Sequence, residues 1–549
     1  MSDWAHPAWP LLLGALLAGT LPVSGRRIVG VAAPAAALAL AWALPGAGER
    51  GGSLMGLALV WLRADALARV FAVVFALITL LGTIYALPTP RRRLLAAALA
   101  AAAAAQGIVL AGDWVTLYLA WEALALASFV LVGDGGGPRA WRAALRYLLV
   151  HAAGGALLLG GIVWHRVTGG SGGVGHLDAA GPGLLILLAF AVNAAIPPLH
   201  AWLTDAYPES APAGGVFLSA FATKSAVYAL ARVFAGEEAL VWAGVTMALY
   251  GVVFATLEND IRRLLGYHIV SQVGYMVAGV GIGTPLALAG ATAHAFCHIL
   301  YKGLLFMGAG AVVHATGRRG LSTLGGLARA MPWTLALYMV GALSISGAPL
   351  LNGFVSKSMV IAAAEADHRA AVVWLLQLAA VGTFLSTGLK LPWFTWGGAT
   401  RETPAAPVPA GMIVAMALTA ALCALTGMAP GLLYALLPAP VHYAPYTAGH
   451  VLESLQLLAG TLAGFLLLRA RLGGEPTVTL DFDRLYRRLG RLITDAVAPR
   501  AAAAADSIEQ ASAALLGRSP AALGPAVAGP VGYAVLVAVA AIGLALLAF

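Results

Sequence analysis

Residues 286–315 read LALAGATAHAFCHILYKGLLFMGAGAVVHA, a run in which Lys302 is the only Asp, Glu, Lys or Arg. The hydrocarbon layer of a membrane is about 30 Å thick and a helix rises about 1.5 Å per residue, so about 20 mostly apolar residues cross it. The run therefore predicts a membrane-spanning helix. Its polar residues His294, His298 and Lys302 recur every four positions, which places them on one helical face.

Similar apolar runs fill most of the chain. Of its 549 residues, 61% are hydrophobic and 10% charged, whereas soluble proteins carry about 25% charged residues. This composition excludes a water-soluble enzyme and predicts an all-α, polytopic membrane protein. We expect spans near residues 8–22, 28–44, 65–87, 94–112, 114–133, 143–165, 183–199, 212–235, 239–258, 265–283, 286–315, 333–366, 371–391, 408–437, 450–469 and 531–548.

Arginine clusters between these runs predict the orientation. They follow the first, third, fifth, ninth and eleventh spans, whereas the opposite links carry few basic residues. Links rich in Lys and Arg stay on the cytoplasmic side, so we expect the N-terminus on the outer face. The first run is preceded by Asp3 and by no Lys or Arg, which argues against a cleaved signal peptide. The clusters are Arg26-Arg27, Arg91 to Arg93, Arg139 with Arg142, Arg262-Arg263 and Arg318-Arg319 with Arg329.

The composition changes after the fifteenth span. In residues 481–516, apolar side chains recur at helical spacing among charged ones from Leu485 to Val497. This pattern predicts a helix that lies along the membrane surface. A cytoplasmic linker helix is the alternative interpretation.

Cysteine and histidine usage limits the chemistry. Cys297 and Cys423 are the only cysteines and lie in apolar runs, which excludes a disulfide framework and an iron–sulfur cluster. Two histidines four residues apart can share a metal ion, but a charged Lys302 on the same face would repel one. A proton relay fits this face better, because His titrates near neutral pH and a desolvated Lys is drawn towards it. For a single buried His, a satisfied hydrogen bond in the core is the alternative.

Other ionisable residues also lie inside predicted spans. Glu122 and Lys224 each lie among apolar neighbours, and an ionisable side chain at bilayer depth costs about 2.5–3.5 kcal/mol on insertion scales. Pro197-Pro198 and Pro349 interrupt two spans, the second shortly before Lys357. Such breaks line ion sites in transporters, although a simple proline kink is the alternative at each.

Several phrases together resemble one known family. They are Trp121-Glu122, Pro198 to Tyr207, Asn259 to Tyr267, Ser271 to Tyr275, His294 to Lys302, Leu324 to Leu327 and Gly353 to Lys357. The chain resembles the antiporter-like subunits shared by respiratory complex I, Mrp-type cation/proton antiporters and membrane-bound hydrogenases over about residues 60–395. Its phrases are most similar to those of the D-type subunits of Mrp antiporters.

The resemblance implies about 14 core helices with two inverted five-helix repeats, each containing a broken helix. The expected regions are N-terminal helices in 1–93, a first half-channel in 94–235, a second in 239–391, core helices in 392–470, a lateral amphipathic helix in 481–516 and a final membrane helix in 531–548.

The resemblance also implies a proton path at mid-membrane. Glu122 is the expected acid of the first half, Lys224 the central lysine, His294, His298 and Lys302 the relay of the second half, and Lys357 the exit residue. The chain is then expected to translocate protons, with or without Na⁺ or K⁺ antiport, as one membrane subunit of a larger complex in the bacterial inner membrane. We expect no cofactor, no metal, no nucleic acid and no covalent chemistry of its own.

One position departs from the family pattern. Counting back from Pro198, Asn193 stands where most members carry a lysine that pairs with the glutamate, and an amide cannot supply positive charge. Candidate modulators are Arg142, Arg146 and His151 in the preceding span, and His268 in the span 265–283. The alternative function is a scaffold and coupling subunit whose first half no longer conducts. An independent transporter of soluble substrates is a third hypothesis.

Overall fold

The computed structural model describes residues 5–54, 56–397, 404–438, 443–473 and 481–482. The expected helices in 481–516 and 531–548 therefore lie outside the described residues, apart from Asp481 and Phe482. The described helices and strands all belong to the unit that spans Met1–Thr479.

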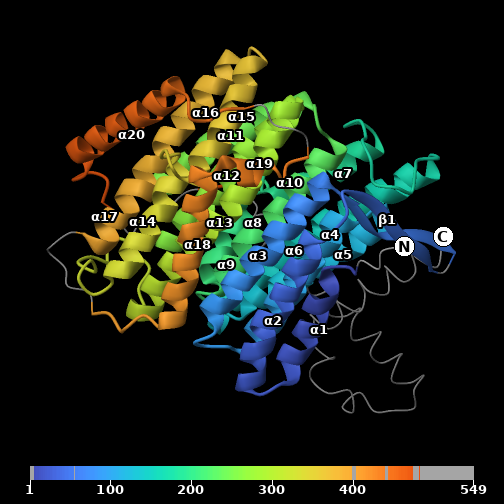
Figure 1. Cartoon of the computed structure of the whole chain (residues 1–549), viewed down its shortest axis with the longest axis horizontal. Helices are drawn as coiled ribbons and strands as arrows, with labels where there is room; N and C mark the ends of the chain where they lie inside the picture. Colours follow the sequence, from blue (N-terminus) through green and yellow to red (C-terminus); the bar gives the residue numbers. More distant parts are fainter. Residues whose placement is uncertain (1–4, 55, 398–403, 439–442, 474–480, 483–549) are drawn as a thin grey trace, which may run out of the picture. The chain divides into compact units, whose positions relative to one another are not determined.

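This unit is a bundle of helices (Figure 1). By length and composition, 12 of its described helices are able to cross a membrane. The elements before Lys224 are α1 (Ala8–Thr20), α2 (Val23–Trp42), β1 (Ala47–Leu54), β2 (Leu57–Asp65), α3 (Ala66–Ala86), α4 (Arg92–Leu110), α5 (Trp114–Gly133), α6 (Gly137–Val167), α7 (Pro182–Ala194), α8 (Ala201–Ala206), η1 (Tyr207–Glu209) and α9 (Gly214–Ala220).

The later elements complete the bundle. They are α10 (Ala222–Val233), α11 (Glu238–Leu257), α12 (Ile261–Ile282), α13 (Pro285–Thr316), α14 (Pro332–Ser346), α15 (Asn352–Ala366), α16 (Ala370–Thr383), the π-helical η2 (Phe384–Lys390), α17 (Leu391–Trp396), α18 (Ala410–Met428), α19 (Pro430–Tyr434) and α20 (Ala448–Leu468).

Helix α13 is the centre of the packing. It contacts α3, α9, α12, α14, α15 and α18, and nearly all of its apolar stretch is buried. Thr284 caps its start by accepting a hydrogen bond from Ala287 N, and Gly317 ends it in the left-handed region at φ 68°. The run that predicts a span over 286–315 therefore forms one continuous helix, and its polar face lies inside protein.

The helical fold is as expected, with several local differences. Strands β1 (Ala47–Leu54) and β2 (Leu57–Asp65) pair as an antiparallel hairpin, which the count of long apolar runs did not anticipate. Arg26 and Arg27 lie in α2, and Arg139 and Arg142 lie in α6, because these helices begin before their apolar runs do. The predicted interruption of 333–366 is present between α14 and α15.

Candidate functional site

The second half of the molecule places its relay residues on one buried face of α13. His294, His298 and Lys302 are all fully buried. The imidazole centroids of His294 and His298 are 6.4 Å apart, and the Tyr301 ring lies 5.2 Å from that of His298. Lys302 Nζ has no hydrogen-bond acceptor among the described residues. Within those residues, no group of three or more His, Cys, Asp or Glu could hold a metal ion.

The broken helix α14–α15 brings Lys357 beside this face. Gly347 ends α14 in the left-handed region at φ 80°, which glycine adopts without steric cost. Lys357 Nζ donates to the Ile345 carbonyl at 2.8 Å and lies 4.9 Å from the centroid of the Tyr275 ring. The helix break thus supplies the lysine with an acceptor that an unbroken helix would have used internally.

Ser356 joins α13 to the helix that carries Lys357. Its hydroxyl lies 3.0 Å from Nδ1 of His294, across 62 residues of sequence. Tyr275 is a second neighbour of both groups, because its ring is 5.7 Å from that of His294. The structure therefore brings His294 and Lys357 into one cluster with Ser356 and Tyr275, which lie in the quoted family phrases but were not predicted as site residues.

In the first half, Glu122 rests on α6. A β-carbon at Gly155 would overlap Glu122 Oε1, and one at Gly154 would lie 3.9 Å from Asn193 Oδ1. Two successive glycines thus bring α5, α6 and α7 together around Glu122 and Asn193. Oε1 of Glu122 is buried and, in the part of the chain that the structure describes, has no hydrogen-bond partner.

The three candidate substitutes for a cation beside Glu122 differ in position. Arg146 forms a two-point ion pair with Asp205, with N–O distances of 2.6 and 3.0 Å. Arg142 is exposed and precedes Gly155 by about 20 Å of helix axis, at about 1.5 Å per residue. His151 is buried one turn from Gly155, and its Nδ1 lies 2.9 Å from the Tyr147 carbonyl. His151 is therefore the modulator placed nearest to Glu122.

Lys224 is buried at an interruption between α9 and α10. Its Nζ donates to the Ser219 carbonyl at 2.7 Å and to the Thr223 hydroxyl at 3.1 Å. Because α9 ends at Ala220, this carbonyl lies in a helix terminus, where backbone acceptors are free to bond a side chain. The lysine is thus held by hydrogen bonds to a carbonyl and a hydroxyl oxygen.

A row of polar residues lies between α12 and η2, and only His268 among them was predicted from the sequence as a site residue. His268 Nε2 lies 2.6 Å from the Ser386 hydroxyl, and Gln272 Nε2 lies 3.3 Å from that of Thr383. At its end, Lys390 Nζ donates to the carbonyls of Thr256 and Glu258 at 2.5 and 2.9 Å. Lys390 lies one residue before the expected end of the span 371–391, where a lysine reaches water readily. The helix instead continues to Trp396 and buries it.

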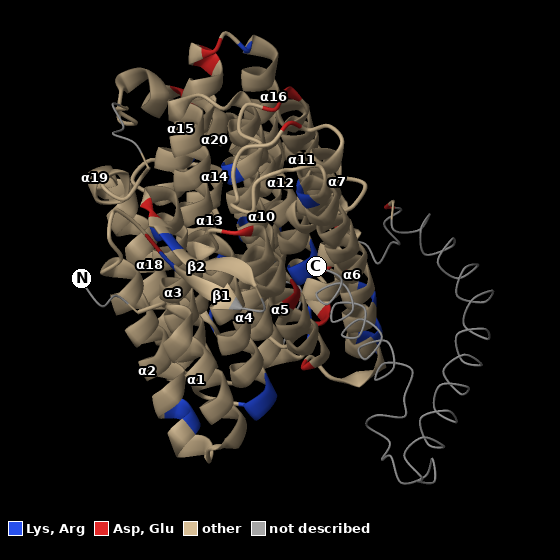
Figure 2. Ribbon diagram, turned by 90° about the vertical axis from the view of Figure 1, so that its right-hand side faces the viewer, with Lys and Arg blue, Asp and Glu red and all other residues tan. Residues whose placement is uncertain are grey.

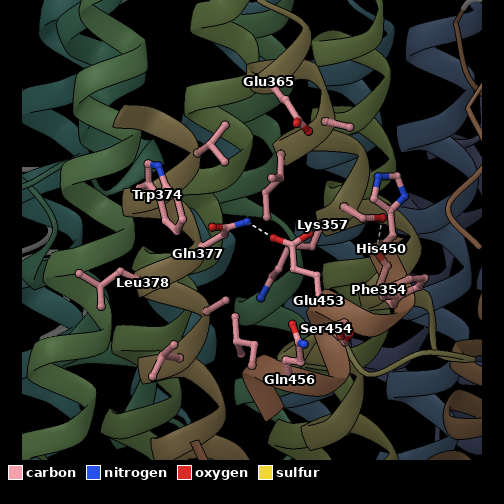
Figure 3. A pocket seen from close by; sticks show the side chains of 18 of the residues that line it. Phe354, Lys357, Glu365, Trp374, Gln377, Leu378, His450, Glu453, Ser454 and Gln456 are labelled. Carbon is pink, nitrogen blue, oxygen red and sulfur yellow. Dashed lines mark hydrogen bonds between the residues drawn. The ribbon is translucent and has the colours of Figure 1, made fainter. Parts of the chain in front are cut away.

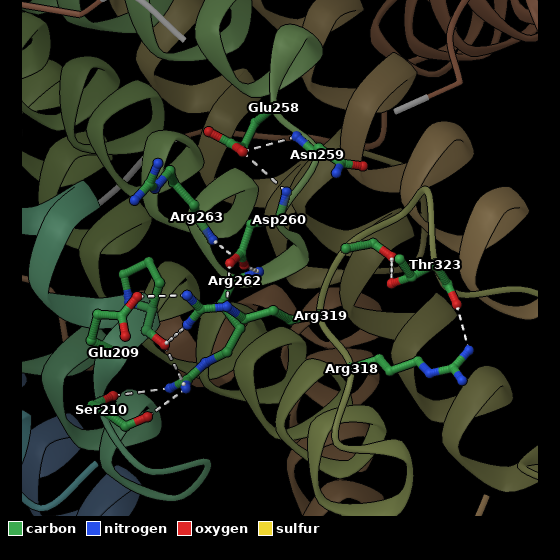
Figure 4. A network of polar contacts seen from close by, with 12 residues as sticks. Glu209, Ser210, Glu258, Asn259, Asp260, Arg262, Arg263, Arg318, Arg319 and Thr323 are labelled. Atoms are coloured by element: carbon green, nitrogen blue, oxygen red, sulfur yellow. Dashed lines mark hydrogen bonds and ion pairs between the residues drawn. The ribbon is translucent and has the colours of Figure 1, made fainter. Parts of the chain in front are cut away.

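A charged network connects the two halves near the start of α12 (Figure 4). Arg262 is buried and donates to the carbonyls of Pro208, Ser210 and Ala211 at 2.5–3.2 Å. Arg319 pairs with Glu209 at 2.6 Å and with Asp260 at 2.7 Å. The segment before α9, which contains Pro208 to Ala211, is therefore bound to the N-terminal end of α12, the helix that carries His268.

Comparisons with known proteins find similar chains and folds. Residues 111–386 match the family model "NADH:quinone oxidoreductase/Mrp antiporter, TM". The chain is 34% identical over 279 residues to the D-type subunit of the Na(+)/H(+) antiporter of Alkalihalophilus pseudofirmus, and the match covers 47% of this chain and 56% of that protein. The chain thus spans about half the length of this curated relative.

Two solved structures have the same fold over more of the chain. A chain of the membrane-bound sulfane sulfur reductase, an archaeal respiratory membrane complex, is 25% identical with a TM-score of 0.75 and 99% coverage of both chains. A chain of respiratory complex I from Thermus thermophilus is 25% identical with a TM-score of 0.68, and covers 79% of this chain and 100% of that one.

Proposed function

The chain belongs to the NADH:quinone oxidoreductase/Mrp antiporter transmembrane family, and from this we propose that it is a proton-translocating membrane subunit of a larger complex. It is a multi-pass membrane protein with helices able to cross the bilayer. The proton path in this proposal runs through Glu122, Lys224, Lys302, His298, His294 and Lys357.

One observation carries the proposal: the contact between His294 and Ser356, the residue next to Lys357. It links the buried face of α13 to the broken helix. Ionisable groups inside a membrane are costly and are kept for function by default. Here several of them lie in one protein interior, and the Ser356 hydroxyl, one residue before Lys357, contacts His294.

Charge transfer along such a row requires no covalent chemistry. Two unit charges 4 Å apart interact by about 4 kcal/mol at an effective dielectric constant of 20. A proton that arrives at one group therefore changes the proton affinity of the next. The driving energy comes from partner membrane subunits or from a cation gradient, and Na⁺ or K⁺ is the exchanged ion if the complex is an antiporter.

Two matching features support the inverted repeats in 94–235 and 239–391. Asp113 caps α5 and bridges to Gly173, and Asp260 caps α12 and bridges to Gly320. Both repeats then contain a helix that ends in the left-handed region, at Ala195 and at Gly347. An equivalent start and an equivalent break in each half are what a duplicated unit would contain.

The proposed location is the bacterial inner membrane with the N-terminus outside. Figure 2 shows Lys and Arg at the end of the molecule where α1 meets α2. Positive charge of this kind marks the cytoplasmic side. The arginine clusters from Arg26-Arg27 to Arg318-Arg319 support the same assignment, because they follow odd-numbered spans in the sequence.

The test uses the full chain with its co-purifying subunits in liposomes. A K⁺ diffusion potential set with valinomycin drives proton uptake, which an enclosed pH dye reports. We expect Lys302→Ala to abolish the flux, and unchanged flux would overturn the relay assignment. Glu122→Gln distinguishes the alternative function: loss with Lys302→Ala alone supports a first half that serves as scaffold, as the absence of a lysine at Asn193 suggests.

A further inference from the structure

A cavity of about 960 Å³ lies between α15, α16 and α20 (Figure 3). Lys357, in the second turn of α15, contributes to its lining at the helix break. Glu365, in the last turn of α15, contributes to the lining where the chain passes to α16. The cavity thus connects the surroundings of Lys357 with the end of the bundle formed by the α15–α16 link.

Helix α20 contributes an acid to the same cavity. Glu453 is the only Asp, Glu, Lys or Arg between Ala448 and Leu468, and its side chain lines the cavity. It lies in the second turn of the helix, where a charge costs less than the about 2.5–3.5 kcal/mol that it costs at the helix centre. Packing does not require this acid, because the residue is exposed.

The position of Glu453 is fixed from two sides. Gln377 of α16 donates a hydrogen bond from Nε2 to Glu453 Oε1, as the dashed line in Figure 3 marks. The next residue, Ser454, donates to the Gly347 carbonyl at 2.7 Å. Gly347 is the residue at which α14 ends. The break that positions Lys357 thus also anchors the helix that carries Glu453.

We propose that Glu453 exchanges protons with Lys357 through this cavity and passes them to the surface; this rests on the proposed function. In the outward direction, an N–H bond of the Lys357 ammonium breaks and an O–H bond forms on the Glu453 carboxylate. The products are a neutral amine and a neutral carboxylic acid, so the total charge in the cavity is unchanged. The acid then releases its proton to water.

Other titratable groups border the cavity, and Glu453 is the one suited to the transfer. Glu365 lies at the end of its helix, whereas Glu453 is held by the amide of Gln377. His450 Nδ1 lies 3.3 Å from the Pro445 carbonyl and 3.5 Å from the Tyr443 hydroxyl. The groups that face Glu453 are Lys357, Glu365, His368, Tyr443 and His450.

The first test separates a proton carrier from a structural hydrogen bond. Glu453→Gln keeps an acceptor oxygen for Gln377 but cannot take up a proton, so flux should fall about tenfold, less than the loss for a fully buried transfer group. Gln377→Leu removes the bond and keeps the acid, so flux should fall less. The reverse ranking would overturn the proposal. Glu49→Gln, in the exposed hairpin, is the matched control and should retain wild-type flux.

The second test is chemical rescue. Glu453→Ala leaves space at an open cavity, and millimolar formate should restore flux in a saturable manner. The same formate titration of the unsubstituted complex measures passive permeation of formic acid. One outcome separates this inference from the proposed function. If the unsubstituted complex conducts protons, Lys357→Ala does not, and every Glu453 variant conducts normally, then this inference fails and the proposed function stands. If the unsubstituted complex carries no proton flux, the proposed function itself fails.

Discussion

The carboxylate of Glu122 rests directly on the backbone of Gly155, because a β-carbon at that position would overlap Oε1. Of the two groups, only the glutamate side chain can move. Glycine at residue 155 therefore sets where the proposed acid of the first half points, although it has no side chain.

Gly155→Ala should displace Glu122 and leave the fold intact. Alanine favours the helix by about 0.5–1 kcal/mol, so thermal stability should hold or rise. Proton flux through the reconstituted complex should fall on the order of tenfold, as for a misplaced catalytic group. Gly160→Ala is the matched control, since its β-carbon would have 4.0 Å to its nearest neighbour. Equal flux in both variants would contradict the prediction.

Lys302→Met and Lys390→Met should differ in their effects on stability. Lys390 satisfies two carbonyls at the end of α11, so its loss should cost about 2–4 kcal/mol. Lys302 has no acceptor among the described residues, and replacing a buried unpaired charge with an apolar side chain is neutral or stabilising. Thermal unfolding in detergent measures both, while proton flux should be lost in Lys302→Met. Destabilisation by Lys302→Met would be the contrary result.

Ser356→Ala should weaken the link between His294 and Lys357. One hydrogen bond contributes about 1 kcal/mol, which corresponds to about a fivefold decrease in flux at about 1.4 kcal/mol per factor of ten. Thr461→Val is the control, because that hydroxyl donates to a carbonyl of its own helix at 2.7 Å. Stopped-flow measurement of proton uptake compares both variants with wild type. Equal rates for all three would argue against the link.

Arg262→Lys should weaken the hydrogen-bonded connection between the two halves of the molecule. The guanidinium reaches three backbone carbonyls and the Ser210 hydroxyl, and an ammonium cannot reproduce this planar fork. We expect a loss of about 2–3 kcal/mol in the free energy of unfolding. Its neighbour Arg263, which is only partly buried, provides the control as Arg263→Lys. Similar melting temperatures for the two variants would refute the assignment.

The buried charges could be identified from sequence because of their cost. Glu122, Lys224 and Lys302 lie near the middle of long apolar runs, so hydropathy alone singles them out. The spacing of four residues likewise predicted that His294, His298 and Lys302 share a face, and the long helix α13 preserves that spacing.

Pairings between distant segments could not be predicted in this way. Ser356 contacts His294 across 62 residues, and nothing in the local pattern indicates it. Lys390 and Glu453 lie near the ends of their predicted spans. A charge costs little there, so hydropathy does not single it out. The hairpin of β1 and β2 was missed because its apolar run is too short for a search for spans.

The π-helical turn at Phe384–Lys390 has a consequence for how this region tolerates changes in chain length. A π-bulge accommodates one more residue than an α-helix of the same rise. Deleting a single residue such as Gly388 should let the turn relax to ordinary α-helical winding, while α16 and α17 keep their places. A relative one residue shorter at this point could therefore keep the whole bundle and lose only the alignment of Ser386 with His268.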